Sequence, residues 1–255
     1  MAFLSSCEEG SQASVVDTTV LTGDLIDLGN LFSEEEELRL TETIRGLEAT
    51  SGIDLVAVTV GHPGEGGITA FALDMTRRIS PGKSGVNNGA IIYISDVLRE
   101  VKVETGYGLE WMIPDSVSGL VIEVMRPDLA VSNYLEAFET GFKEIVSRTD
   151  SVNWQAALTP WESGAKAGLV QGQILRFSAK GLPRPYQEGV PENLQFHPNY
   201  FIEIIPEGTN ISQQLYFSGY MRDMVDRIVY HDQTPTITAL VLTTEPLRLG
   251  LMGMQ

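Results

Sequence analysis

The residues whose types and spacing are best suited to chemistry surround one predicted β-hairpin. Residues 90–94 form an unbroken apolar run, which is typical of a short strand buried on both faces. Residues 101–104 alternate valine with charged side chains, which indicates a strand with one face in water. The two strands are close enough in sequence to pair around a turn centred near Val97.

The register of this hairpin decides which polar groups meet. With the turn centred near Val97, Asn88 lies opposite Gly106, and Glu104 lies on the neighbouring strand beside Ala90. The backbone carbonyls of the glycine-containing loop after the hairpin belong to the same end. The pattern therefore predicts a group of oxygen ligands on a rigid edge.

Such a group is suited to a hard divalent cation. Ca²⁺ takes about six to eight oxygens from carboxylates, amides, carbonyls and water, and Mg²⁺ prefers oxygens as well. Glu110 and Asp115 follow in the loop and can fold back, so the predicted ligands are Asn87, Asn88, Glu104, Glu110 and Asp115. A structural alternative stays open, in which Asn88 and Glu104 only cap the end of the hairpin through hydrogen bonds.

Other motifs lack the neighbours that their chemistry needs. Gly82-Lys83-Ser84 is similar to the end of a phosphate-binding loop, but Arg77 stands where the first glycine is required. The three histidines are isolated and lack the spacing of zinc ligands; they are His62, His197 and His231.

Several helices and a strand must position the hairpin. Ser33 with Glu36 predicts a capping box at the start of a helix that ends at Gly52. Residues 55–60 are predicted as a buried strand and residues 68–79 as a helix.

Two further helices are expected after the hairpin. The first covers residues 115–125 and ends before Pro127, and the second covers residues 133–148. This order predicts an α/β domain over residues 24–150, in the form of a three-layer α/β/α sandwich with a small mixed sheet.

The composition changes after residue 150, which indicates a second domain. Glycine and proline are concentrated between residues 181 and 198. We expect a smaller α+β or mostly β domain over residues 151–255. Its predicted elements are strands at 169–178, 200–205 and 235–242 and a helix at 217–230.

The charge of the chain is strongly acidic and uneven. The net charge is −17, and residues 1–150 hold 25 acidic against 10 basic side chains. No basic patch offsets this field, so nucleic acid is not expected as a partner. An acidic domain suits hard cations or a basic protein partner, although solubility alone also explains the charge.

The single cysteine suggests how the chain reaches a membrane. Residues 4–7, Leu-Ser-Ser-Cys, are similar to a bacterial lipobox, in which Cys7 would be lipidated and residues 1–23 would form a linker. The charged and apolar regions of a signal peptide are missing before it, which we interpret as a trimmed leader. No segment approaches the ~20 apolar residues of a membrane span, so attachment is expected only through Cys7 or a partner. The alternative is a free cysteine near a frayed end.

Six stretches of the chain, taken in order, form a larger pattern. They are Ile26-Asp27-Leu28-Gly29-Asn30-Leu31-Phe32-Ser33, the strand 55–60, Asn87-Asn88-Gly89, Arg99 with residues 101–104, Gly106-Tyr107-Gly108-Leu109-Glu110, and Asp115 with Pro127 and Tyr134. Together they resemble the TPM-domain family over about residues 24–148. Asn87 departs from the family, which tends to have aspartate there, and this removes one carboxylate.

The resemblance implies an α/β/α sandwich and a choice of roles. TPM domains occur in the thylakoid lumen, in bacterial envelopes and beside animal receptors. One plant member is described as an acid phosphatase, others assist membrane protein complexes, and some bind calcium or other divalent ions. The resemblance alone adds Asp27 to the candidate metal ligands.

Two functions are compatible with these observations. The first is an interaction or assembly module in the bacterial cell envelope that binds Ca²⁺ or Mg²⁺ and an envelope protein. The alternative is a metal-dependent acid phosphatase acting on phosphate monoesters, in which the cation activates a water. The sequence offers no evident nucleophile–base pair, and Arg99 lies toward the other end of the hairpin, so enzymatic activity stays open.

Overall fold

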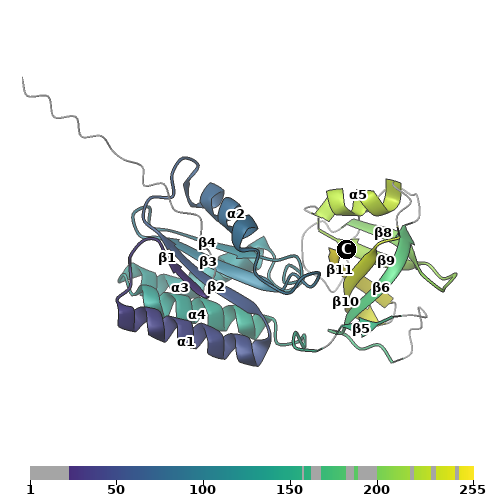
Figure 1. Ribbon diagram of the computed structural model, residues 1–255, viewed down its shortest axis with the longest axis horizontal. Coiled ribbons are helices and arrows are strands. Elements are labelled where there is room, and N and C mark those ends of the chain that lie inside the picture. Colours follow the sequence, from purple (N-terminus) through teal and green to yellow (C-terminus); the bar gives the residue numbers. More distant parts are fainter. Residues whose placement is uncertain are drawn as a thin grey trace, which may run out of the picture.

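The computed structural model consists of two packed parts that lie end to end (Figure 1). It describes residues 23–156, 158–161, 168–181, 187–188, 200–218, 221–230, 234–244 and 247–255. The first part is mixed α/β and the second is mostly β, as the sequence predicted. The lipobox-like Cys7 and the histidines His197 and His231 lie outside the described residues.

The first part contains a four-stranded mixed sheet. The strands lie in the order β1-β2-β3-β4, with β1, β2 and β3 parallel and β4 antiparallel to β3. The sequence did not predict β1, because a three-residue strand is defined by its partner rather than by its own pattern. The strands are β1 (Leu25–Asp27), β2 (Asp54–Val60), β3 (Gly89–Ser95) and β4 (Glu100–Thr105).

Four helices surround this sheet, and the first has the predicted capping box. The Ser33 Oγ accepts the backbone N–H of Glu36, and the Glu36 carboxylate accepts the backbone N–H of Ser33 at 2.9 Å. Gly52 ends this helix in a left-handed conformation, as expected. The helices are α1 (Glu34–Ser51), α2 (Gly67–Ile79), α3 (Asp115–Ala130) and α4 (Tyr134–Arg148).

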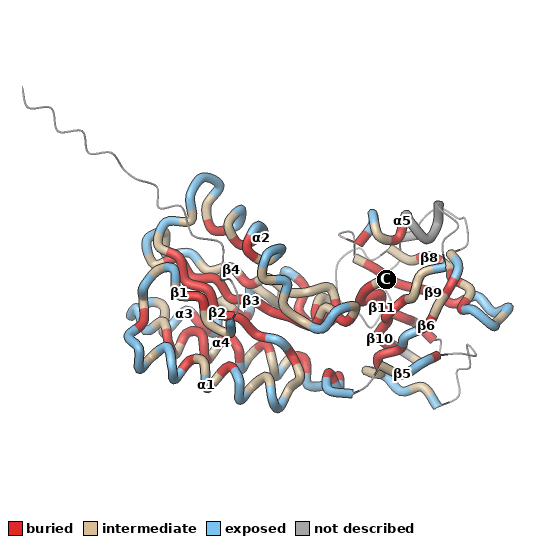
Figure 2. Tube along the Cα trace, in the orientation of Figure 1, coloured by how far each residue is buried: buried red, intermediate tan, exposed pale blue. Residues whose placement is uncertain are grey.

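The two faces of the sheet pack against different helices. Ile92 lies in a buried cluster with side chains of α1, α3 and α4, whereas Ile91 and Tyr93 lie in a second cluster with α2. Figure 2 shows the resulting buried strands and the exposed outer side of α1. Because successive residues of a strand face opposite sides, a shift of one residue in pairing moves a side chain between these two clusters.

The helix α3 continues past Pro127, where the sequence predicted its end. Proline removes one hydrogen bond, to the carbonyl four residues earlier, and this carbonyl belongs to the exposed Glu123. Leu129, in the last turn, packs against the main core. The predicted end at residue 125 was therefore wrong by about one turn, because packing of that turn outweighs the lost hydrogen bond.

The second part closes into a barrel of five strands. The ring runs β6-β10-β11-β9-β8, and pairing of β8 with β6 closes it. The short strands β5 (Thr159–Pro160) and β7 (Gln187–Glu188) add to the sheet, and α5 (Arg222–Tyr230) packs beside β6. The barrel strands are β6 (Ile174–Gly181), β8 (Tyr200–Pro206), β9 (Gln213–Phe217), β10 (Thr236–Thr244) and β11 (Leu247–Met254).

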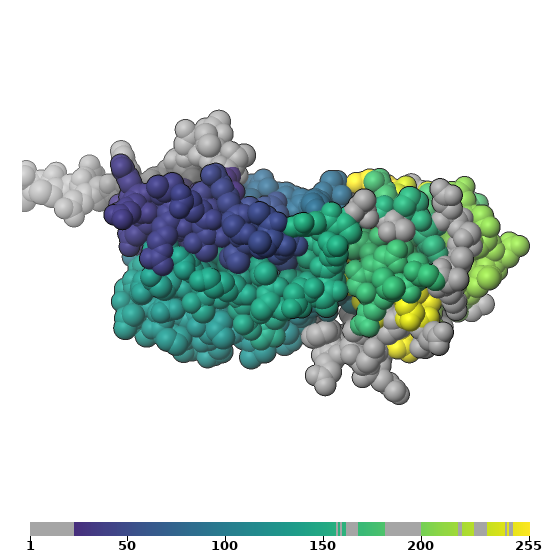
Figure 3. Space-filling model, turned by 90° about the horizontal axis from the view of Figure 1, so that it is seen from below, coloured from purple at the N-terminus to yellow at the C-terminus, as the bar shows by residue number. Residues whose placement is uncertain are grey.

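The segment after α4 packs onto the first part before the barrel begins. Trp154 is buried and its Nε1 donates to the Thr149 carbonyl at 3.0 Å, while Lys83 Nζ donates to the Trp154 carbonyl at 2.7 Å. Figure 3 shows α1 beside the teal region that holds α3 and α4, with the barrel at the other end. None of the helices in the described ranges combines the length and apolar character that crossing a bilayer requires.

Candidate functional site at the joint between the two parts

The hairpin pairs one residue away from the predicted register. Glu104 lies opposite Ile91 instead of Ala90. The turn contains four residues, 96–99, so its centre falls after Val97 and not on it. Because of this shift, Glu104 shares the face of the sheet that packs against α2, and the predicted register was wrong.

The Asn88 side chain forms hydrogen bonds with two other segments of the chain. Its side chain is fully buried, and its Oδ1 accepts the backbone N–H of Lys83 at 2.9 Å. Its Nδ2 donates to the Gly52 carbonyl at the end of α1, at 2.7 Å. These hydrogen bonds agree with the alternative in which Asn88 has a structural role at the end of the hairpin. They direct the Asn88 amide away from Glu104.

Asn87 reaches into the second part of the chain. Its backbone is left-handed, with φ 52, and its Nδ2 donates to the Met252 carbonyl of β11 at 2.7 Å. A Cβ on Gly253 would lie 2.4 Å from the Gly85 carbonyl oxygen, so the two segments meet backbone to backbone. The hairpin end therefore binds a strand of the barrel.

Trp111 anchors the same joint from the loop after the hairpin. Its indole is buried, and Nε1 donates to the Leu251 carbonyl at 3.1 Å. A Cβ added to Gly250 would lie 2.6 Å from this ring, and one added to Gly108 would lie 2.1 Å from the Val86 carbonyl oxygen. The glycines that suggested a ligand loop thus allow close packing. Neither Trp111 nor β11 was predicted as part of this joint, since no local pattern connects them.

Glu110 is half-buried beside this joint. Burial raises the pKa of its carboxyl to about 7, the Ser218 hydroxyl of the barrel acts in the opposite direction, and the charges of Asp115 and Glu104 raise it. The group therefore exchanges a proton near neutral pH. Of these residues, only Ser218 belongs to the second part of the chain.

Two of the predicted ligands, Asp115 and Glu104, lie within electrostatic reach of a third, Glu110. Glu104 forms an ion pair with Lys102 at 3.4 Å, and Asp115 is exposed at the start of α3, where the helix dipole favours a negative charge. Across the described ranges, no group of three or more His, Cys, Asp or Glu side chains is arranged to hold a metal ion. The side chains of Asn87 and Asn88 are engaged elsewhere.

Asp27 lies at the end of β1 and holds the following turn. Its carboxylate accepts the backbone N–H groups of Leu31 and Phe32, each at 3.1 Å, and the hydroxyl of the buried Thr59. These donors come from two segments, so the carboxylate connects β2 to the start of α1. Three donors already occupy the two oxygens.

Replacing Asp27 with asparagine is expected to lower the free energy of unfolding by about 1–3 kcal/mol, because one oxygen acceptor becomes a donor facing N–H groups. Urea denaturation in EDTA measures this loss. Asp74→Asn, which removes only an exposed pair with Arg78, is the matched control and should change stability by less than about 0.5 kcal/mol. A loss that occurs only with added Ca²⁺ would contradict the structural role.

The first part is a mixed α/β unit, and the end of its hairpin contacts β11 of the barrel. Residues 25–148 match the family described as TPM domain. This part of the chain therefore belongs to the TPM-domain family, as its sequence pattern predicted. No curated protein is similar enough to match the chain.

Solved structures that are similar to a portion of this chain include three with identities of 13–27%. The N-terminal domain of a protein from P. gingivalis is 27% identical, with a TM-score of 0.44, and the match covers 49% of this chain and 81% of that one. The N-terminal domain of cg2496 from Corynebacterium glutamicum is 13% identical, with a TM-score of 0.38 and coverage of 58% and 86%. BA42 from Bizionia argentinensis is 15% identical, with a TM-score of 0.42 and coverage of 46% and 80%.

Proposed function

We propose that this TPM-domain chain works as an interaction or assembly module of the bacterial cell envelope. The observation that carries the proposal is the hydrogen bond from Asn87 Nδ2 to the Met252 carbonyl. An amide can donate to a carbonyl, whereas the carboxylate expected from the family pattern can only accept. The asparagine at position 87 therefore supplies an N–H donor that can bind a backbone carbonyl.

The rest of the joint supports the same role. A buried tryptophan that donates to a backbone carbonyl is the type of anchor that dominates protein–protein contacts, and Trp111 has this geometry against Leu251. The proposal takes the TPM part as a three-layer α/β/α sandwich. The separate packing of α2 and of the other helices on opposite faces of the sheet supports this classification.

A divalent cation, Ca²⁺ or Mg²⁺, is proposed to bind weakly beside this joint. Glu104, Glu110 and Asp115 are its proposed ligands, because the charges of Asp115 and Glu104 both disfavour the charge on Glu110. A cation would offset that repulsion without help from Asp27 or from the asparagine amides, whose bonds are described above. The acidic charge of the domain favours the same cation.

The envelope location rests on the sequence of residues 4–7, outside the described part of the chain. In this proposal a lipidated Cys7 provides the membrane contact, and an envelope protein is the partner. Nucleic acid is not a proposed partner, because the net charge of −17 opposes phosphate binding.

Calorimetric titration of the whole chain with CaCl₂, and separately with MgCl₂, tests the proposed cation. We expect saturable binding with a Kd of about 10⁻⁴–10⁻³ M, as in extracellular calcium modules. Glu110→Gln and Asp115→Asn should each weaken it at least ~10-fold, since a hard cation loses a charged oxygen. Glu65→Gln, on an exposed loop, is the control and should bind as the wild type does.

The same samples distinguish the module from the acid phosphatase. We expect no metal-dependent release of phosphate from p-nitrophenyl phosphate. Release that Glu110→Gln abolishes would favour the phosphatase instead. The absence of any binding heat would remove the cation from the proposal and leave the protein-binding role at the joint.

A further inference from the structure

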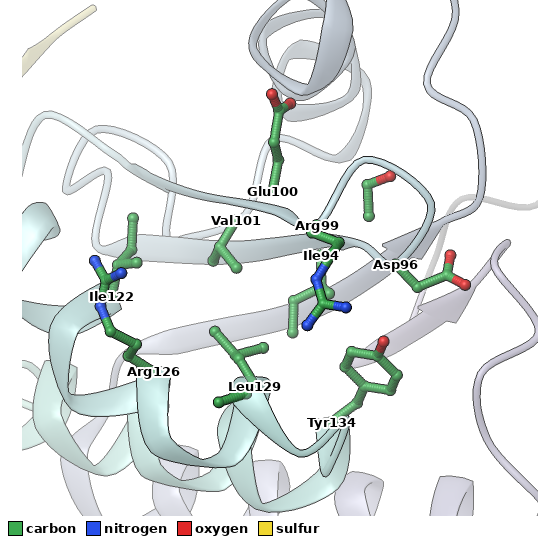
Figure 4. A pocket seen from close by; sticks show the side chains of 11 residues that line it. Ile94, Asp96, Arg99, Glu100, Val101, Ile122, Arg126, Leu129 and Tyr134 are labelled. Carbon is green, nitrogen blue, oxygen red and sulfur yellow. The ribbon is translucent and has the colours of Figure 1, made fainter.

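A groove lies at the turn of the hairpin, away from the joint. It has a volume of about 340 Å³, and residues of the β3–β4 turn and of α3 and α4 line it. Figure 4 shows Asp96, Arg99 and Tyr134 around this space. The apolar residues of the groove are Ile94, Val101, Ile122 and Leu129.

Arg99 occupies a turn position that ordinarily favours another residue. It is the last of the four turn residues, its N–H donates to the Asp96 carbonyl at 3.3 Å, and its φ is 53. Glycine and asparagine adopt this left-handed conformation most readily, and a long side chain does so at a cost. Residues with backbone strain of this kind cluster at functional sites.

The Arg99 guanidinium is the available cation of the groove. It forms no ion pair with any residue in the described ranges, whereas Arg126 is held by Glu123 at 2.6 and 3.0 Å. Figure 4 shows the guanidinium directed into the groove, toward Tyr134 and Leu129. An arginine with free donors above an apolar floor is suited to a planar anion.

The remaining charges restrict what this anion can be. Glu100 directs its carboxylate away from the groove, toward Gly67 at the start of α2 (Figure 4). Because Glu123 holds Arg126, Arg99 is the one cation on the lining without an ion pair among the described residues. A ligand with one negative charge matches this single cation better than a doubly charged phosphate. The Asp96 Oδ1 is buried without a hydrogen-bond partner among the described residues.

We propose that this groove binds the C-terminal carboxylate of a partner peptide that ends in an aliphatic residue. Arg99 pairs with the carboxylate, and the Tyr134 hydroxyl is placed to donate to it. The last side chain packs against Ile122 and Leu129. This is a second site, and it does not depend on the cation or on the contacts of the joint.

The size of the groove favours a peptide over a small anion. Its volume of about 340 Å³ is roughly ten times the ~30 Å³ share of one water molecule. Inorganic phosphate would leave most of this space and all of the apolar floor unfilled. The last side chain of a peptide packs against the apolar residues of the groove, and the rest of the peptide extends out of it.

The test is binding of a short peptide to the full chain by calorimetry. The probe is an N-acetyl tripeptide, Ala-Leu-Leu, with a free carboxylate, and it is compared with the same peptide as its amide. We expect saturable binding of the acid and at least ~10-fold weaker binding of the amide, because the ion pair with Arg99 is lost. Equal binding of both, or no binding of the acid at millimolar concentration, would overturn the proposal.

Substitution of Arg99 separates binding from folding. Arg99→Gly relieves the left-handed turn, so its Tm should equal or exceed that of the wild type while peptide binding falls at least ~10-fold. Tyr134→Phe keeps the ring and should weaken binding several-fold, and Arg78→Gln on α2 is the matched control without effect. Wild-type binding by Arg99→Gly overturns the proposal, and so does equally strong competition by inorganic phosphate or by isovalerate.

Discussion

Trp111→Ala is expected to lower the free energy of unfolding by about 3–5 kcal/mol and to separate the unfolding of the two parts. The indole is buried between the hairpin loop and β11, so its removal leaves a cavity. The Leu251 carbonyl also loses its donor. Urea denaturation followed by far-UV circular dichroism should show one transition for the wild type and two for the variant.

Two variants show whether the joint itself causes this effect. Trp111→Phe keeps most of the apolar volume and loses only the hydrogen bond, so we expect a loss of about 1–3 kcal/mol. Trp154→Ala removes an equally buried indole that donates within the first part, to Thr149. It should destabilise the first part without weakening the contact to β11. If Trp111→Ala costs less than about 1 kcal/mol and unfolds in one step, the joint does not depend on Trp111.

Much of the first part could be predicted from local sequence patterns. The capping box at Ser33, the glycine at position 52 and the helical spacing of apolar residues are local signals, and the structure confirms the elements that they predicted. The β1 strand and the last turn of α3 were missed, because contacts from distant segments stabilise them. Of the barrel strands, β6, β8 and β10 were predicted, whereas β9 and β11 were missed although each pairs with the strand before it in the sequence.

The candidate site shows why side-chain placement is harder to predict than elements. The hairpin was predicted, but its four-residue turn moves the pairing by one position. This single shift places Glu104 opposite Ile91, on the face that packs against α2, away from the Asn88 amide. The partners of Asn87 and Trp111 lie 165 and 140 residues further along the chain, and no local pattern indicates them.

Glu110→Gln is expected to make the protein more stable at pH 8 and to flatten its pH dependence. The pKa of Glu110 rises from 4.5 to about 7 on folding, mainly through burial. A carboxyl whose pKa is raised stabilises the fold fully below pH 4.5, and this contribution is lost as the pH rises toward 7. The full shift corresponds to about 3 kcal/mol, and solvent screening of a half-buried group reduces it to about 1–2 kcal/mol.

Glu48 provides the matched control, because its pKa is also raised to about 7, chiefly by burial. It accepts the backbone N–H of Leu55 at 2.8 Å within the first part and has no role at the joint. Urea denaturation gives the free energy of unfolding at pH 5 and at pH 8. The difference between these two values should be smaller in either single variant than in the wild type, and smallest in the double variant Glu48→Gln/Glu110→Gln. A wild-type pH dependence in Glu110→Gln would show that this carboxyl is not the group that titrates at the joint. The double variant Trp111→Ala/Glu110→Gln tests where the raised pKa comes from. If Glu110→Gln no longer changes the pH dependence of stability in the Trp111→Ala background, the raised pKa arises from the contact with the barrel, because opening the joint exposes Glu110 to water.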